Sequence, residues 1–112
     1  MPTERYECGL AAARAAISGK WKPPILMVLD ANGPTRFGQL RRDLEGVTEK
    51  VLSQQLKEME GHGLVERTCY DEVPPRVEYA LTPRGRQLFL ALADLSAWGD
   101  EHFGHLVGPA HT

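Results

Sequence analysis

Long apolar runs are missing from this sequence. The longest uninterrupted apolar stretch is Ile25 to Leu29, far shorter than the ~20 residues that a membrane-spanning helix needs. The first residues, MPTERYECG, are charged, and no apolar signal core follows them, which argues against export. We therefore expect a cytoplasmic protein with no membrane partner.

Cysteine is also scarce. The chain has 2 cysteines, Cys8 and Cys69, and no C-x-x-C pair, so a disulfide framework is excluded and both are expected as free thiols. His102 and His105 lie three residues apart and could share a metal with His111, but no third ligand has the spacing of a known site, which favours chance. No nucleophile–base pair or Gly-rich phosphate loop occurs either, so we expect neither an enzyme nor a cofactor.

An excess of basic charge is the third absence. The formal net charge is −2, whereas nucleic-acid-binding proteins are usually basic. Any such function must therefore depend on where the charges lie and not on their sum. The remaining composition, 42% hydrophobic and 25% charged over 112 residues, is typical of a single soluble globular domain.

The first half of the chain predicts three helices. Residues 10–18 are rich in alanine, the strongest helix former. Pro23 and Pro24 are tolerated in the first turn of a second helix, which ends near residue 32. Residues 35–44 carry apolar side chains at helical spacing and predict a third, short helix.

The segment from Glu49 to about His62 is the most informative. Thr48 is placed to cap this helix, and a short turn separates it from the helix before. At about 100° per residue, Leu52, Leu56 and Met59 share one side. The opposite side presents two cations, a hydroxyl and an amide: Lys50, Ser53, Gln54 and Lys57.

The second half predicts a hairpin and a long helix. Residues 64–70 and 77–81 are rich in β-branched and aromatic residues and are separated by a proline-containing loop, the pattern of a β-hairpin. Thr82-Pro83 then opens a helix to about Leu106, with Gly99 and Gly104 as candidate breaks.

The predicted fold class is α+β, mainly helical, in a single domain over residues 1–112. Helix, helix, helix–turn–helix, hairpin and helix is the order of a winged helix-turn-helix domain. The helix-turn-helix covers about 36–62, and the wing covers about 64–81. The helices at about 9–18 and 83–106 flank them.

Several segments carry a resemblance to a known family. They are Cys8, GKW at 19–21, RFGQLRR at 36–42, VLSQQLKEME at 51–60, GLVER at 63–67, VPPRVEY at 73–79 and LT at 81–82. In these segments the chain resembles the HxlR-type regulators, relatives of the MarR-type winged helices, from Cys8 to Trp98. It departs from them at Gly9, where proline often follows the cysteine, and in having Cys69.

The resemblance implies a homodimeric bacterial transcriptional regulator of double-stranded DNA, associated with the nucleoid when bound. It also implies that the first and last helices form the dimer. The last helix is apolar on more than one side, which requires a second partner surface; surplus core in a monomer is the alternative. The candidate dimer residues are Leu10, Ile17, Leu88, Leu92, Leu95 and Trp98.

DNA binding is also the best interpretation of the residues themselves. Ser and Gln side chains can pair with base edges, and Lys can contact phosphate or guanine. Arg76 at the wing suits a narrow minor groove, and the three arginines of the first motif helix would lie near the backbone. The predicted DNA-binding residues are Arg36, Arg41, Arg42, Lys50, Ser53, Gln54, Lys57 and Arg76.

Acidic residues oppose this interpretation. Residues 35–81 hold 7 basic and 9 acidic side chains, so DNA binding requires the acids to point away from the duplex. Helical spacing suggests this for Glu60 but less clearly for Glu49 and Glu58. We expect modest non-specific affinity that falls with rising salt.

Two further residues have open interpretations. Cys8 is either a sensor thiol, favoured by the helix N-terminus that follows and by relatives that sense oxidants or electrophiles at this place, or a small packing residue at the dimer interface. Trp21 either lines a pocket for a small-molecule effector or belongs to the core. Cys69, on a strand, is expected to be inert core.

The predicted function is thus a sequence-specific DNA-binding regulator, a repressor rather than an activator. The alternative is a winged-helix protein-interaction module without sequence-specific DNA binding, which the acidic balance keeps open. Replacement of Gln54 and Lys57 by alanine distinguishes the two functions: a regulator should lose DNA binding with its fold and dimer intact, and an interaction module should be unaffected.

Overall fold

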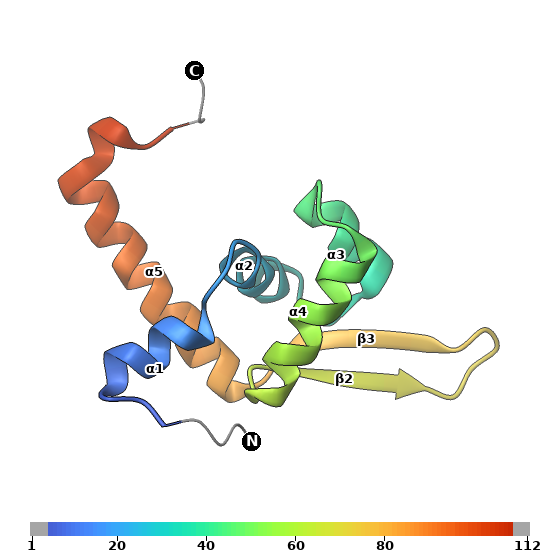
Figure 1. The fold of residues 1–112 in the computed structure, drawn as a ribbon. Coiled ribbons are helices and arrows are strands. Elements are labelled where there is room, and N and C mark those ends of the chain that lie inside the picture. The colour runs from blue at the N-terminus through green and yellow to red at the C-terminus, as the bar shows by residue number, and fades with distance from the viewer. Residues whose placement is uncertain (1–4, 109–112) are drawn as a thin grey trace.

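The computed structural model describes residues 5–108 (Figure 1). The order of elements expected for a winged helix-turn-helix domain is confirmed. The elements are α1 (Gly9–Ala16), α2 (Lys22–Asn32), β1 (Thr35–Arg36), α3 (Phe37–Leu44), α4 (Glu49–Gly61), β2 (Val65–Tyr70), β3 (Arg76–Leu81), α5 (Pro83–Phe103) and the 3₁₀ turn η1 (Gly104–Leu106).

Helix α2 lies at the centre of the domain. It contacts α3, α5 and β3, and Pro23 and Pro24 occupy its first turn. It ends at Gly33, whose φ of +74° is a conformation that only glycine adopts without strain. The fully buried side chains of the core come from α2, α3, α4 and the start of β2: Ile25, Leu26, Leu29, Leu40, Leu52, Leu56, Met59 and Val65.

A three-stranded antiparallel sheet packs beside these helices in the order β1-β3-β2. The short strand β1 corrects the sequence analysis, which assigned Thr35 and Arg36 to the following helix. Thr35 pairs with Tyr79 and Arg36 with Glu78. A two-residue strand has no periodicity of its own, so only its pairing partner defines it.

The β2–β3 hairpin projects away from the helices (Figure 1). In β2 only Val65 is buried, and the other five residues are exposed. Cys69 is one of them, so its expected place in the core is wrong. It lies opposite Val77, on the part of the hairpin that extends past the packed helices.

Helix α5 begins against the turn that follows α4. The Thr82 hydroxyl caps the helix by accepting from the Gly85 N–H at 3.0 Å, and it also donates to the Gly63 carbonyl. The helix continues through Gly99 and ends at Phe103, immediately before Gly104. Of the two candidate breaks, Gly104 is therefore the one at which the α-helix stops.

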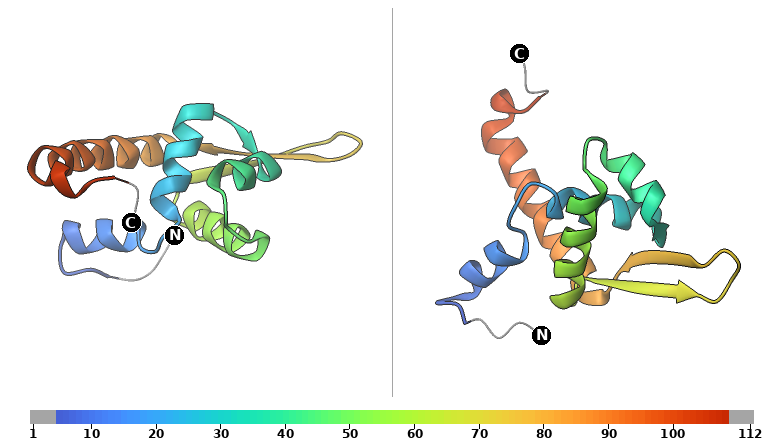
Figure 2. Two further views of the ribbon diagram at one scale, coloured as in Figure 1. Left: turned by 90° about the horizontal axis from the view of Figure 1, so that it is seen from above. Right: turned by 45° about the vertical axis from the view of Figure 1, so that its right-hand side comes forward.

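Apolar side chains remain uncovered on one side of the molecule. Helix α1 and the distal half of α5 lie on the side opposite the hairpin in all three views (Figures 1 and 2). Leu10, Leu95 and Trp98 are 71%, 60% and 53% exposed there. Within residues 5–108, no helix is both long and apolar enough to cross a membrane.

Candidate nucleic-acid interface

Helix α4 divides into two faces, as its sequence predicts. Leu52, Leu56 and Met59 are fully buried in the core. On the opposite face, the four residues that the sequence analysis predicted for DNA binding are solvent-exposed: Lys50, Ser53, Gln54 and Lys57. The buried face holds the helix against the domain, so the exposed face is presented on a supported element.

The turn before α4 is fixed by local contacts. The Thr48 hydroxyl accepts from the Val51 N–H at 3.1 Å, which caps the helix. Arg41 donates from Nε to the Val47 carbonyl at 3.2 Å, and Val47 is buried. These contacts fix the direction in which α4 leaves α3.

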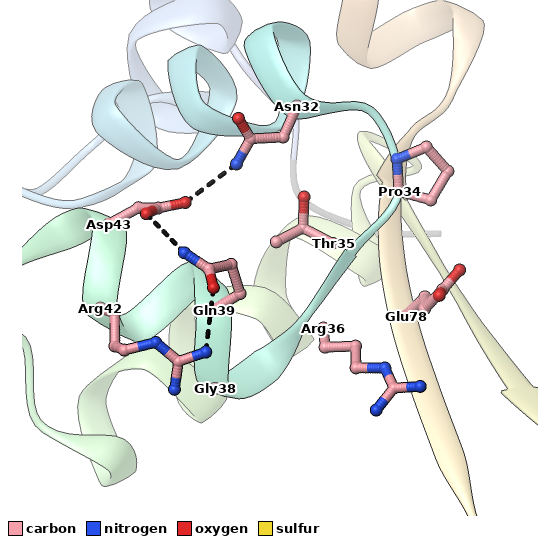
Figure 3. A pocket seen from close by; sticks show the side chains of 9 residues that line it. All are labelled: Asn32, Pro34, Thr35, Arg36, Gly38, Gln39, Arg42, Asp43 and Glu78. Atoms are coloured by element: carbon pink, nitrogen blue, oxygen red, sulfur yellow. Dashed lines mark hydrogen bonds between the residues drawn. The ribbon is translucent and has the colours of Figure 1, made fainter.

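Helix α3 carries a chain of polar contacts beside this turn (Figure 3). Arg42 donates to Gln39 Oε1 at 2.9 Å, and Gln39 donates to Asp43 at 2.8 Å. Asp43 also accepts from Asn32 at 2.9 Å. Arg36 and Arg42 line the same open pocket of about 680 Å³, and both side chains are exposed. The carboxylate of Asp43 thus accepts hydrogen bonds from two amides, while Arg36 and Arg42 present positive charge at the surface.

Glu58 is held by a lysine that the sequence analysis did not single out. Lys22, at the start of α2, is only 3% exposed, and its Nζ lies 2.7 Å from Glu58 Oε1. The hydrogen bond from Lys22 is the main cause that lowers the pKa of Glu58, against the opposing effect of burial. The two residues are 36 positions apart, so no local pattern could indicate the pair.

Arg76 does not extend freely from the wing. It is half-buried at the start of β3, and it forms ion pairs with Glu72 at 2.8 Å and with Glu78 at 3.2 Å. Its guanidinium also lies 3.9 Å from the centre of the Tyr70 ring. An insertion into a minor groove would require these contacts to break.

The acidic excess of residues 35–81 is therefore partly compensated within the domain. Four of the 9 acids have partners: Asp43 accepts two amides, Glu58 pairs with Lys22, and Glu72 and Glu78 pair with Arg76. Arg36, Arg41, Arg42, Lys50 and Lys57 are exposed. The local balance at α3 and α4 is more favourable to an anionic partner than the net charge suggests.

The model of the HxlR-like helix-turn-helix family matches residues 16–106. This covers the helix-turn-helix, the wing and all of α5. The chain belongs to the HxlR-like helix-turn-helix family. The resemblance noted in the sequence is thereby confirmed, and the protein is a transcriptional regulator of the helix-turn-helix type, a class without catalytic function.

Relatives of this HxlR-like regulator agree with the assignment. A regulatory protein named MalR from Fusobacterium mortiferum is 42% identical over 98 residues, which are 88% of this chain and 92% of MalR. A crystal structure of a MarR-family transcriptional regulator from Enterococcus faecalis V583 is 43% identical with a TM-score of 0.81, over 88% and 89% of the two chains. The reduced form of the redox regulator HypR is 34% identical with a TM-score of 0.79, over 88% and 97%.

Cys8 and Trp21, the two residues with open interpretations, lie in the first part of the chain, before α2. Cys8 is exposed at the N-terminus of α1. Trp21 packs against the core with the Lys20 ammonium 5.0 Å from its ring centre, which favours the packing interpretation.

The candidate dimer residues divide into two groups. Ile17, Leu88 and Leu92 pack against the core, whereas Leu10, Leu95 and Trp98 are exposed.

His102 has an aromatic and an acidic neighbour. His102 lies 4.8 Å from the Trp98 ring and 3.7 Å from Glu101, and His111 lies outside the described residues. Between residues 5 and 108, no three His, Cys, Asp or Glu side chains are grouped to hold a metal.

Proposed function

We propose that this regulator is a homodimeric repressor that inserts α4 into the major groove of operator DNA. The observation that carries the proposal is the exposed face of α4, Lys50, Ser53, Gln54 and Lys57, on a helix whose other face is fully buried. Side chains of these types reach base edges and phosphates from one direction. Arg36, Arg41 and Arg42 on the neighbouring elements would contact the backbone.

The test is DNA binding by the variant with Gln54→Ala and Lys57→Ala. DNA from upstream of the regulator's own gene is titrated by fluorescence anisotropy at fixed salt. The variant should lose about tenfold or more in affinity, because one base contact and one phosphate contact are removed. Arg86→Ala is the matched control, since Arg86 is an exposed cation at the start of α5, paired with Asp30 at 3.4 Å. Unchanged binding by the double variant, with its fold and mass intact, would favour a protein-interaction module.

The exposed apolar side chains of α1 and α5 support the homodimer. Leu10, Leu95 and Trp98 are more than half exposed, and exposed apolar side chains gathered on one side of a domain are typical of an interaction site. A twofold dimer presents two α4 helices to DNA, which matches two half-sites. A dimer bound across a promoter blocks access to that DNA, and on this ground we propose repression rather than activation.

Sensing through Cys8 is the second part of the proposal. Cys8 is an exposed thiol at the start of α1, next to the proposed dimer surface, and HypR is described as a redox regulator with structures of a reduced and an oxidized form. Mild peroxide or diamide should lower DNA affinity of the native protein at least severalfold. The Cys8→Ser variant should not respond, and Cys69→Ser should respond as the native protein does. Equal responses of the native protein and Cys8→Ser would exclude Cys8 as the sensor.

A further inference from the structure

Gln54 contacts a carboxylate that is itself held from inside the domain. Gln54 Nε2 lies 3.5 Å from Glu58 Oε2, one helical turn along α4. The other oxygen of Glu58 lies 2.7 Å from Lys22 Nζ, and the Lys22 side chain is only 4% exposed. The three side chains thus form a row from α2 to the outer face of α4. It begins at the buried ammonium of Lys22, continues through the half-buried carboxylate of Glu58 and ends at the exposed amide of Gln54.

This arrangement determines which end of the Gln54 amide faces outward. A carboxylate only accepts hydrogen bonds, so the NH₂ group of Gln54 must face Glu58 and the carbonyl oxygen must turn away from it. The reversed amide would place two acceptors against each other. With one N–H engaged by Glu58, Gln54 keeps one N–H and one carbonyl oxygen for another molecule.

An acceptor next to a single donor matches one base. In the major groove adenine presents the N6 amino donor beside the N7 acceptor, whereas guanine presents two acceptors, N7 and O6. Guanine would require two donors from the same amide, and the Glu58 contact removes one of them. The oriented amide therefore fits adenine and disfavours guanine.

We propose that Gln54 reads an adenine, and that Glu58 and Lys22 are positioning residues that orient its amide. The inference depends on the proposed insertion of α4 into the major groove. Lys22 acts at a distance from the DNA: it neutralises Glu58 and fixes the carboxylate, which in turn holds the Gln54 NH₂ group. A carboxylate on the DNA-facing helix then contributes to base selection without a base contact of its own.

The experiment selects preferred sites for the purified full-length protein from a pool of randomised duplex DNA. The native protein should enrich a motif with one adenine per half-site that the Gln54→Ala variant no longer enriches. Anisotropy titrations then compare duplexes that carry adenine, guanine or 7-deazaadenine, which lacks the N7 acceptor, at that position. The native protein should prefer adenine over guanine by about tenfold, and Gln54→Ala should bind all three duplexes equally.

Glu58→Gln and Lys22→Met test the positioning residues. A glutamine at position 58 can present either oxygen or NH₂ to Gln54, so the preference for adenine should fall to about threefold or less. Affinity of Glu58→Gln for random-sequence duplex should equal or exceed the native value, because one negative charge near the phosphates is lost. A loss of folding would instead lower the preference for adenine and the affinity for random-sequence duplex together. Lys22→Met should lower the preference for adenine at the same position of the motif. Circular dichroism checks that this variant is folded.

Glu60→Gln is the matched control, since it removes the same charge from an exposed position of α4. Glu60→Gln should enrich the same motif as the native protein, with the same preference for adenine over guanine. No enriched motif for the native protein would overturn the proposed function itself. A motif that Gln54→Ala also enriches, or a guanine or cytosine at the Gln54-dependent position, would overturn the adenine assignment. A native preference in Glu58→Gln would overturn the role of Glu58.

Discussion

At the scale of single residues, Gly85 allows a close approach between α5 and the start of the hairpin. It is buried in the first turn of α5, and a Cβ at this position would lie 2.0 Å from the carbonyl oxygen of Leu64. The obstacle is backbone at the start of the hairpin and not the end of a flexible side chain. A larger residue must therefore displace either the helix or the strand.

We expect Gly85→Ala to lower the free energy of unfolding by about 3 kcal/mol, the upper range for an overpacked site. Urea denaturation followed by circular dichroism measures the change. Gly99→Ala is the control on the same helix, because a Cβ there meets nothing within 4 Å. It should leave stability unchanged or raise it by about 0.5–1 kcal/mol through helix propensity. Equal stabilities of the two variants would contradict the close approach.

The Lys22–Glu58 pair makes a second prediction at this scale, in the pH dependence of stability. Lys22 lowers the pKa of Glu58 in the folded protein, so the folded state binds fewer protons at this carboxyl than the unfolded chain does. The stabilisation is complete above the ordinary pKa of about 4.5 and is lost as the pH falls through the lower, folded value.

Melting temperatures of the native protein and Glu58→Gln, measured from pH 7 to pH 3, test this prediction. The native protein should be the more stable at pH 7, and the difference should shrink at the acidic end. A difference that stays constant over the whole range would show that the ion pair contributes nothing.

At the scale of elements, Thr82 joins the end of the hairpin to the start of α5. Its hydroxyl accepts from Gly85 N–H and donates to Gly63 O, and its own N–H donates to Leu64 O at 3.1 Å. One residue thereby connects the helix start with the turn that follows α4.

We expect Thr82→Ala to lower the free energy of unfolding by about 1–2 kcal/mol, because both hydroxyl hydrogen bonds are lost. Thr82→Ser keeps the hydroxyl and should retain most of the stability. Chemical denaturation of the three proteins under one set of conditions gives the comparison. Equal losses in the serine and alanine variants would assign the effect to the methyl group instead.

The wing is stabilised differently from the helices. Beyond Val65 its strand β2 is exposed, so burial contributes little to it. Cross-strand contacts take that role: Tyr70 pairs with Arg76, and the guanidinium stacks on the ring while it binds two carboxylates. Such pairs are the unit by which exposed hairpins are stabilised.

At the scale of the whole molecule, α1 and the distal half of α5 lie on the side opposite the wing (Figure 2), and they carry the exposed Leu10, Leu95 and Trp98. The interior holds one core, and Leu95 and Trp98 lie outside it. Apolar surface left in water at this extent is costly. In the proposed dimer a second copy of the chain, which brings the same surface, would cover it by twofold symmetry.

Leu95→Glu should convert the dimer to a monomer, because it places a charge at the apolar surface of each subunit. Light scattering at micromolar concentration should give half the native mass, and affinity for operator DNA should fall at least tenfold as half-sites bind independently. Val73→Glu is the control, an equivalent change at a fully exposed residue of the wing tip that should leave the mass native. A monomeric native protein would contradict the proposal directly.

Local sequence accounts for the helices, the hairpin and the two faces of α4. Thr48 and Thr82 cap the helices that follow them, as their positions before Glu49 and Pro83 predict. Which side chains share a face of α4 follows from helical geometry alone, once the buried leucines identify the inner side. These features depend only on contacts within a few residues, and a single segment of the sequence is enough to predict such contacts.

Contacts between distant segments account for the rest. The pairing of β1, the Lys22–Glu58 ion pair and the exposure of Cys69 each depend on where another part of the chain packs. The stacking of Arg76 on Tyr70 of the other strand likewise forms only when the hairpin closes. Periodicity reports the environment of a residue averaged along its own element, and it carries no information about a single partner 36 positions away.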